Sequence, residues 1–193
     1  NEVPFNENDK IFSENPYGIS KIFCEKILST LSPEIFNIGI LRHFNPAGAH
    51  SSGLLGQNEI SNYTNLFSII DDVAFRLNDF VPIYGNDYKT KDGSCVRDFI
   101  HVYDIAEIHY LILEKINKLK ISKVLNCGYN KGNSVLDVAN EFKRQSLRKV
   151  EIVYSKRRTN DLVKIIASNN RLIRFINWIP KFNNLGKIVK SCI

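Results

Sequence analysis

Apolar residues recur with a helical period in some stretches of this 193-residue chain and with a strand period in others, and the two kinds of stretch alternate. Alternating helices and strands bury their apolar surfaces best when the helices cover the faces of a mostly parallel sheet. The sequence therefore predicts an α/β fold, with helices over 17–31, 66–77, 105–113, 135–144, 170–175 and from 185 onward, and strands over 36–44, 81–84, 96–102, 123–127 and 150–154.

Capping residues indicate where three of these helices begin. Asn15 can accept a hydrogen bond from the first helical turn, and Pro16 occupies the first helical position, where a missing N–H does no harm. Asp104 is expected to cap the helix that follows it. Ser134 and Asp137 have a spacing similar to that of a capping box, which predicts a helix start at this point.

Basic charge is the most prominent feature of the composition. The net charge is +6, and many of the basic residues lie between 143 and 158. Such a cluster is typical of nucleic-acid surfaces. Here Glu141, Glu151 and Asp161 interrupt or flank the cluster, and no alternation of aromatic and basic residues suggests stacking on bases. We therefore expect no nucleic-acid partner, whereas a diphosphate ligand needs only one or two of these arginines.

Two further classes, membrane proteins and metal sites, are disfavoured by what the sequence lacks. No run approaches 18 apolar residues, so no membrane partner is expected. The four cysteines form no Cys-x-x-Cys and the four histidines are not at metal-ligand spacing, so we expect no metal site. Free cysteines within apolar patterns are typical of a reducing compartment, which favours a cytoplasmic location.

Tyr17 and Lys21 lie four positions apart in the first predicted helix, so their side chains share one face. An ammonium group close to a phenol favours the ionised phenolate. Such a tyrosine can take a proton from a sugar or alcohol hydroxyl while a nicotinamide accepts the hydride. Taken alone, the pair is weak evidence, and two exposed polar residues on an amphipathic helix explain it better.

Several longer motifs follow this pair, in the order 41–50 (LRHFNPAGAH), 85–88 (GNDY), 92–93 (DG), 96–104 (VRDFIHVYD), 133–138 (NSVLDV) and 157–158 (RR). Together they closely resemble UDP-glucose (UDP-galactose) 4-epimerases, of the extended short-chain dehydrogenase/reductase superfamily. The resemblance runs from about Val3 to the last residue. Several motifs in the right order are far more specific than any one of them.

The resemblance implies an NAD-dependent 4-epimerisation of UDP-glucose and UDP-galactose through a 4-keto sugar. Tyr17 then corresponds to the residue that removes the proton from the sugar's 4-hydroxyl while hydride passes to NAD. Lys21 corresponds to the residue that holds the nicotinamide ribose. Phe44 corresponds to a residue that lines the nicotinamide, although an aromatic core position at the end of a strand explains Phe44 equally well.

The resemblance also implies contacts with the substrate near two predicted elements. Asn45 corresponds to a substrate-binding asparagine at the carboxyl end of a buried strand, a usual place for ligand contacts. Its alternative role is to cap its own turn. Asn65 and Leu66 correspond to residues that contact the nucleotide through side chain and backbone, and from the sequence alone they suit a helix cap.

The remaining implied contacts concern the base, the diphosphate and the ribose. The uracil-binding strand of the family, in which an aromatic ring supplies a stacking face, corresponds to Pro82, Ile83 and Tyr84. Arg97 and Arg158 correspond to arginines that clamp the diphosphate with planar guanidinium groups. Arg97 has a structural ion pair with Asp98 as its alternative. Asp161 corresponds to a carboxylate that binds ribose hydroxyls.

The family's dinucleotide-binding unit begins with a Gly-rich phosphate turn, and none of the ten glycines here forms Gly-x-x-Gly-x-x-Gly. The resemblance thus implies the C-terminal part of a longer enzyme, from a truncated or split gene. Residues 1–45 correspond to the remainder of a Rossmann-type doubly wound sheet with the Tyr-Lys helix. Residues 46–193 correspond to the smaller α/β region that binds the UDP-sugar, with about 96–127 returning to the Rossmann sheet.

The expected partners are a UDP-sugar and either a missing N-terminal half or a second copy in a homodimer. The isolated chain is expected not to retain NAD, and the strand over 36–44 is expected to present an exposed apolar edge. Two other interpretations stay open. One is a non-catalytic UDP-sugar-binding remnant, and the other is a related nucleotide-sugar dehydratase or decarboxylase, which the 41–50 and 85–88 motifs favour less.

Overall fold

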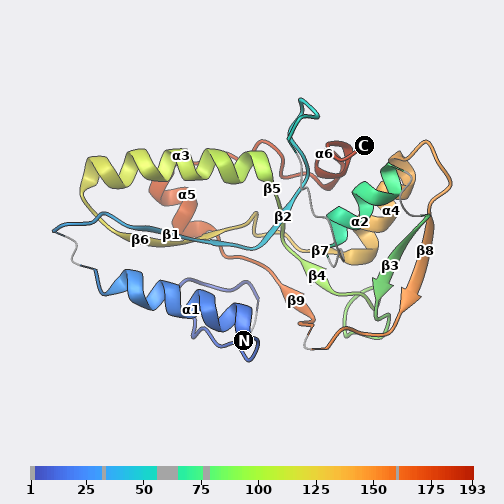
Figure 1. Cartoon of the computed structure of the whole chain (residues 1–193), viewed down its shortest axis with the longest axis horizontal. Helices are drawn as coiled ribbons and strands as arrows, with labels where there is room; N and C mark the ends of the chain where they lie inside the picture. Colours follow the sequence, from blue (N-terminus) through green and yellow to red (C-terminus); the bar gives the residue numbers. More distant parts are fainter. Residues whose placement is uncertain (1–2, 32–33, 56–64, 76–78, 160) are drawn as a thin grey trace.

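The computed structural model describes residues 3–31, 34–55, 65–75, 79–159 and 161–193 (Figure 1). Helices and strands alternate along most of it, so the predicted α/β fold is confirmed. The helices are α1 (Pro16–Ser29), α2 (Leu66–Ala74), α3 (Val102–Leu119), α4 (Val135–Gln145), α5 (Asn170–Ile176) and α6 (Leu185–Lys190). The strands are β1 (Gly39–His43), β2 (Asn45–Ala47), β3 (Phe80–Tyr84), β4 (Val96–Arg97), β5 (Phe99–His101), β6 (Lys123–Cys127), β7 (Asn133–Ser134), β8 (Glu151–Ser155) and β9 (Lys164–Ile165).

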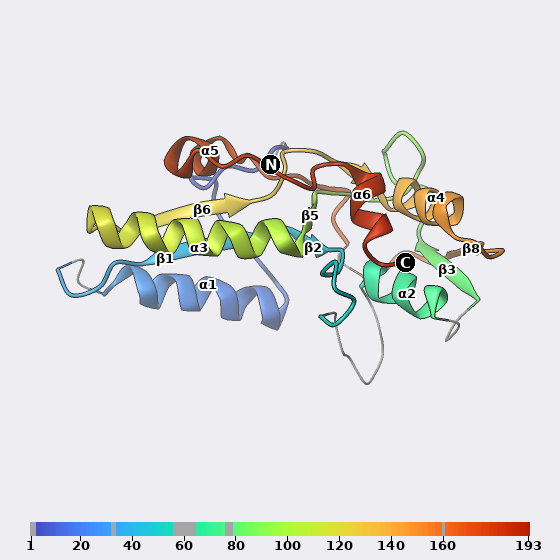
Figure 2. The ribbon, with the colours of Figure 1, turned by 90° about the horizontal axis from the view of Figure 1, so that it is seen from above.

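Parallel strand pairs form the framework of the molecule. At one end β1 pairs with β6, and at the other end β3 pairs with β8. Between them lie the parallel pair of β2 and β5 and the small sheet in which β4 separates β7 from β9. Helix α3 packs along β1 and β6, while α1 and α5 lie on opposite sides of this pair (Figure 2).

Two hydrophobic cores correspond to the two ends of the molecule. The core at the end with α1 and α3 is built largely from one face of α3 and from β6, with Ile108, Ile112, Ile116, Leu125 and Cys127 as members. The core at the other end lies between α2, α4, α6 and β3, with Ile70, Val81, Ile83, Phe142 and Val189 as members. Tyr129 packs against both cores and so joins them.

Two of the three predicted helix caps are confirmed. The Asn15 side-chain oxygen accepts a hydrogen bond from the Gly18 N–H at 2.7 Å. Ser134 and Asp137 form a full capping box, because each side chain accepts a hydrogen bond from the other residue's backbone N–H. Both helices therefore begin where the sequence predicts.

The prediction that Asp104 caps its helix is wrong. Helix α3 begins three residues earlier than predicted, at Val102, and His101 is the cap: its Nδ1 accepts a hydrogen bond from the Tyr103 N–H at 3.0 Å. Asp104 is buried, and its carboxylate accepts hydrogen bonds from the Tyr129 hydroxyl at 2.5 Å and from the Phe182 N–H at 3.0 Å. The carboxylate is thus used to hold distant segments and not its own helix end.

The predicted strand over 96–102 is interrupted at Asp98, which is fully buried. The carboxylate accepts hydrogen bonds from the N–H groups of Tyr129, Asn130 and Ala167 at 2.9, 2.9 and 3.1 Å. Burial raises the pKa of Asp98, although these N–H groups favour its charged form. One side chain thus joins the segments that follow β6 and β9 to the junction of β4 and β5.

Other element boundaries differ by a few residues, and the predicted end of the second helix at Leu77 lies outside the described residues. The strand predicted over 36–44 is shorter and pairs with β6, and no described strand pairs with its other edge. Helix α1 exposes large apolar side chains, including Phe23 and Ile27. Among the described segments, no helix has the length and apolar character needed to cross a membrane.

Replacing Asp98 with Ala should lower the free energy of unfolding by about 3–5 kcal/mol, because buried N–H groups lose their partner. Asp98→Asn keeps an acceptor oxygen and should cost less, about 1–3 kcal/mol. Urea unfolding monitored by circular dichroism measures both. Glu151→Gln, at a side chain that is 63% exposed, is the control and should change stability by less than about 0.5 kcal/mol. An Asp98→Ala variant as stable as this control would contradict the role given to Asp98.

Acid should weaken the fold through His101. Burial lowers the pKa of this histidine below its usual 6.5, so the unfolded chain takes up the proton first as the pH falls. The stability that depends on neutral His101 is then full above about pH 7 and is lost as the pH drops toward 5. His101→Asn can still cap α3 but does not titrate, so its unfolding free energy should fall less between pH 7.5 and 5. Equal losses in both proteins would show that other groups set the pH dependence.

Candidate active site

A cavity of about 250 Å³ brings together most of the residues that the sequence analysis assigned to the substrate. We call it the arginine pocket. Of the nine assigned substrate residues, eight line it: Asn45, Asn65, Leu66, Pro82, Tyr84, Arg97, Arg158 and Asp161. They come from five separate segments of the chain, so the fold and not the sequence spacing brings them together. The ninth, Ile83, is fully buried in the hydrophobic core and does not line the cavity.

Asn45 and Asn65 reach the pocket from the starts of two elements. Asn45 opens β2, where its N–H donates to the Asp98 carbonyl oxygen at 3.1 Å. Asn65 caps α2, with its side-chain oxygen accepting a hydrogen bond from the Phe67 N–H at 3.2 Å. The helix-cap interpretation of Asn65 is therefore correct and is compatible with its position in the pocket.

Arg97 forms its ion pair with Asp161 and not with its neighbour Asp98. Its Nη2 donates to Asp161 Oδ1 at 2.6 Å, and its Nη1 donates to the Val96 carbonyl oxygen at 2.8 Å. Arg97 is only 7% exposed, and the Asp161 side chain is 27% exposed at the mouth of the pocket. A buried guanidinium with a fixed orientation is well suited to an anionic oxygen-rich ligand.

Arg158 lies over the ring of Tyr84, with its guanidinium carbon 3.9 Å from the centre of the ring. Both residues line the arginine pocket. With two arginines and a single aspartate, the lining of this pocket carries a net positive charge. It is therefore suited to the diphosphate of a nucleotide sugar.

Tyr17 and Lys21 lie on α1, outside the arginine pocket. The Lys21 ammonium nitrogen is 5.1 Å from the centre of the Tyr17 ring, so the predicted one-turn spacing brings the two groups together. Tyr17 is 73% exposed. Helix α1 begins at the same end of the β1–β6 pair as the carboxyl end of β1, so its first turn lies on the side of the molecule where β2 begins (Figure 1).

Phe44 lines a second cavity, of about 1010 Å³, between the segment that precedes α1 and the segment around Leu162. We call it the N-terminal cavity. Arg42 also lines it and is held there by Glu25 of α1 and by the Glu7 carbonyl oxygen. Phe44 and the next residue, Asn45, therefore face two different cavities.

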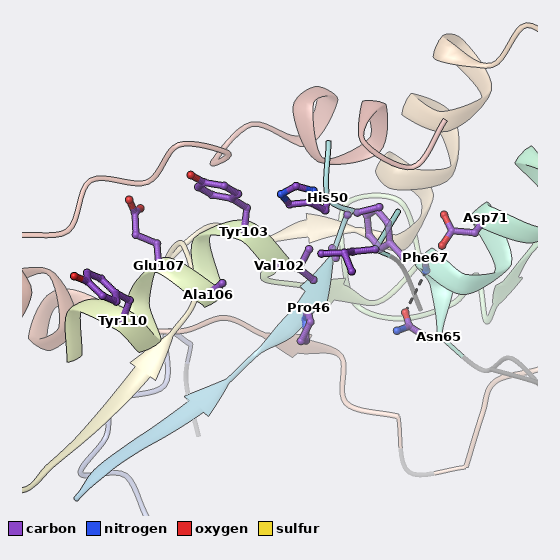
Figure 3. Close-up of a pocket in the computed structure, with 14 residues that line it drawn as sticks. Pro46, His50, Asn65, Phe67, Asp71, Val102, Tyr103, Ala106, Glu107 and Tyr110 are labelled. Carbon is purple, nitrogen blue, oxygen red and sulfur yellow. Dashed lines mark hydrogen bonds between the residues drawn. The ribbon is translucent and has the colours of Figure 1, made fainter. Parts of the chain in front are cut away.

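A third cavity, of about 880 Å³, lies between α2, α3 and the loop after β2 (Figure 3). It shares Pro46 and Asn65 with the arginine pocket. Two carboxylates, Asp71 and Glu107, lie at its opposite ends, and no described arginine or lysine lines it. Burial raises the pKa of Asp71 to about 6. Despite its larger size, this cavity is unsuited to a diphosphate, and the arginine pocket is the better candidate site.

The described residues contain no group of three or more His, Cys, Asp or Glu side chains that could hold a metal ion. Sequence reasoning missed several residues that line the arginine pocket, namely Pro46, Ile69, Cys95, Phe99 and Val135. These residues are apolar or neutral, and the spacing of apolar residues along the chain predicts that they belong to the hydrophobic core and not to a binding site.

Comparison with known proteins agrees with this geometry. The chain matches the family described as "NAD dependent epimerase/dehydratase family" over residues 1–128. UDP-glucose 4-epimerase 2 of Arabidopsis thaliana is 40% identical over 183 residues, which cover 93% of this chain and 52% of that protein. The UDP-glucose 4-epimerase of Halalkalibacterium halodurans is 35% identical over 191 residues, covering 98% and 57%. The chain spans about half the length of the curated relatives it matches.

Solved structures give the same result. The UDP-glucose-4-epimerase of Stenotrophomonas maltophila, with bound NAD and formylated UDP-arabinopyranose, matches with a TM-score of 0.93 and 32% identity over 99% of this chain and 57% of that one. The enzyme of Bifidobacterium longum, in complex with NAD+ and UDP, matches with a TM-score of 0.91 and 33% identity, again over 99% and 57%. The family resemblance drawn from the motifs is confirmed, and the chain belongs to the NAD dependent epimerase/dehydratase family.

Proposed function

We propose that this chain supplies the UDP-sugar site and the Tyr-Lys helix of an NAD-dependent UDP-glucose 4-epimerase. The observation that supports this most directly is the arginine pocket, in which eight of the nine assigned substrate residues meet. Two arginines for the diphosphate and two asparagines for the sugar or ribose hydroxyls are the donors that a UDP-sugar requires.

The nicotinamide end of NAD fits residues of this chain. Phe44 offers an aromatic face in the N-terminal cavity, and the Lys21 ammonium can donate to ribose hydroxyls. A bound NAD would supply the acceptor for hydride from the sugar's C4 and the donor for its return. The chain has no Gly-rich phosphate turn for the adenine end, so we propose that a preceding dinucleotide-binding segment, in the same chain or a separate one, completes the cofactor site.

In this proposal Tyr17 removes the proton from the sugar's 4-hydroxyl and later returns a proton to the 4-keto oxygen. Lys21 stabilises the charge on Tyr17 during these steps. Arg97 and Arg158 hold the diphosphate throughout. Because the anchoring contacts are made to the UDP, the 4-keto sugar can turn about the diphosphate and present its other face to the hydride.

A second candidate function is UDP-sugar binding without turnover. The observation in its favour is that the described residues place the substrate contacts in one pocket, while Tyr17 lies outside this pocket and is largely exposed to solvent. UDP binding by the 193-residue chain, without epimerisation, would support this alternative.

The two proposed roles can be separated by substitution in an enzyme completed with the N-terminal part of the Arabidopsis thaliana relative, fused before Asn1. Tyr17→Phe should lower turnover of UDP-galactose by ~10²–10⁴-fold while leaving UDP affinity unchanged, because the hydroxyl serves proton transfer. Arg97→Ala should weaken UDP binding by ~1.5–3 kcal/mol, the scale of a hydrogen bond to a charged group. Coupled-assay kinetics and calorimetric UDP titration measure the two effects.

Arg144→Ala is the matched control for charge, because Arg144 pairs with Glu141 on an exposed helix face and lines none of the three cavities. Its turnover and UDP affinity should equal those of the parent. If the Tyr17→Phe enzyme kept full turnover, the proposed role of Tyr17 as the proton acceptor would be refuted. If the Arg97→Ala enzyme bound UDP normally, we would conclude that Arg97 and its ion pair with Asp161 serve the structure and not the ligand.

A further inference from the structure

Helix α1, which carries Tyr17 and Lys21, has no buried residue. Only Gly18, Ile22 and Glu25 of this helix are partly buried, and all its other residues are exposed. These three residues are spaced by four and by three positions, so they form the one face of α1 that lies against the described chain. Helix α1 runs beside β1 (Figure 2). Within the described chain, apolar packing therefore contributes little to the position of α1.

Hydrogen bonds from Arg42 of β1 connect this face of α1 to the sheet. The Arg42 Nε donates to Glu25 Oε2 at 3.0 Å, and its Nη2 donates to Glu25 Oε1. The two bonds form a bidentate pair, which fixes direction as well as distance. Both side chains are 22% exposed, so the pair is largely shielded from water. Among the described residues, these are the only side-chain hydrogen bonds that join α1 to a strand.

The third N–H group of Arg42 binds the segment that precedes α1. Its Nη1 donates to the Glu7 carbonyl oxygen at 2.9 Å. The buried Glu7 side chain accepts a hydrogen bond at 2.9 Å from the N–H of Asn126, the residue of β6 that is in register with Arg42. The Asn126 side chain donates to the Phe5 carbonyl oxygen at 2.9 Å. One guanidinium thus joins β1, the segment before α1 and α1 itself.

The position of Glu25 on α1 connects this guanidinium to the Tyr-Lys pair. Glu25 lies one turn after Lys21 and two turns after Tyr17, so the three side chains follow one stripe of the helix. A planar guanidinium that holds Glu25 in a bidentate pair therefore limits rotation of this stripe about the helix axis.

Arg42 also determines which partner Glu25 binds. Four positions is the spacing of an ion pair on a helix, so Lys21 and Glu25 could bind each other. Arg42 occupies both oxygens of Glu25 instead. The Lys21 ammonium lies near Tyr17, 5.1 Å from the centre of its ring. The charge of Lys21 is thereby left to act on the tyrosine.

We propose that Arg42 is a positioning residue for the proton-transfer step, which acts through Glu25 to hold Tyr17 and Lys21 in place. The inference rests on the proposed function, in which Tyr17 takes the proton from the sugar. Proton transfer requires the two oxygen atoms within hydrogen-bond reach, so a small rotation of α1 lowers the rate. Arg42 and Glu25 do not line the arginine pocket, so UDP binding should not depend on them.

The first test uses the completed enzyme, in which the N-terminal part of the Arabidopsis thaliana relative is fused before Asn1. Turnover of UDP-galactose is measured as kcat, and UDP affinity by calorimetry. Arg42→Lys keeps the charge but cannot form the bidentate pair, so kcat should fall by about tenfold with UDP affinity unchanged. Glu25→Gln keeps one acceptor oxygen and should have a similar effect on kcat.

Arg144→Lys is the matched control. Arg144 binds Glu141 on the exposed face of α4 with the same two donors, Nε at 2.9 Å and Nη2 at 2.6 Å. This pair lines none of the three cavities. The control should keep the kcat and the UDP affinity of the parent. A residue that only stabilised the fold would instead lower turnover and UDP-binding capacity together.

A double-mutant cycle separates an effect through Glu25 from a direct contact with the cofactor, since Arg42 also lines the N-terminal cavity. In a Glu25→Gln background, Arg42→Lys should cause no further loss of kcat. In a Tyr17→Phe background, Arg42→Lys should not lower the residual turnover, because residues that act as a unit are not additive. Persistence of the full loss in either background would overturn the inference.

Hydrogen exchange in the 193-residue chain gives a second test that needs no activity. Arg42→Lys and Glu25→Gln should speed the exchange of the α1 amides by about tenfold, the scale of one lost hydrogen bond between charged groups, and leave α4 unchanged. Equal α1 exchange in parent and variants would contradict the inference. If Arg42→Lys does not fold by circular dichroism, Glu25→Gln decides both tests.

Failure of the proposed function gives a different pattern. If the Tyr17→Phe enzyme kept full turnover, the catalytic role of Tyr17 would be refuted, and the inference about Arg42 with it. If Tyr17→Phe lost turnover while Arg42→Lys and Glu25→Gln behaved as the Arg144→Lys control, the inference alone would be refuted.

Discussion

The hydrogen bonds of the buried Asp98 carboxylate hold the middle of this structure together. They join the segments that follow β6 and β9 to the point where β4 gives way to β5. Arg97 is the preceding residue, and successive side chains of an extended chain point to opposite sides. Because Asp98 points inward to the backbone N–H groups, Arg97 points to the pocket, where Asp161 is its partner. The alternative pairing of Arg97 with Asp98 is thus excluded by the geometry of the extended chain. The position of the pocket's buried guanidinium thus depends on a carboxylate that does not itself line the pocket.

Strong periodicity made most helices and the longer strands predictable, including β6 and the capped helices α1 and α4. The two- and three-residue strands β2, β7 and β9 were not predicted, because two or three residues are too few to show the alternation of apolar and polar side chains that indicates a strand. The start of α3 was misplaced because Asp is a far commoner cap than His. His101 takes that role here because Ser191 lies 3.0 Å from its Nε2 and Phe182 stacks on its ring. Both contacts join residues that are some eighty or more positions apart, so the sequence around His101 carries no pattern that would reveal them.

The lining of the arginine pocket was predictable in part, and the contacts within it were not. Motif resemblance named the residues that meet in the arginine pocket, yet it could not show which side chains bind one another. The contact of Arg158 with Tyr84 depends on the register of β3 with β8, two strands that lie about seventy residues apart in the sequence. Likewise, the motif that contains Phe44 and Asn45 does not reveal that the two residues face separate cavities.

Because Phe44 and Asn45 line different cavities, the number of residues between β1 and β2 determines which side chain faces which cavity. A single peptide bond separates the residue of the N-terminal cavity from the residue of the arginine pocket. Inserting or deleting one residue just before Phe44 would exchange the two faces and turn the asparagine toward the N-terminal cavity, whereas a change of two residues would preserve them. A change of one residue in the step from β1 to β2 should therefore disturb both cavities more than a change of two residues.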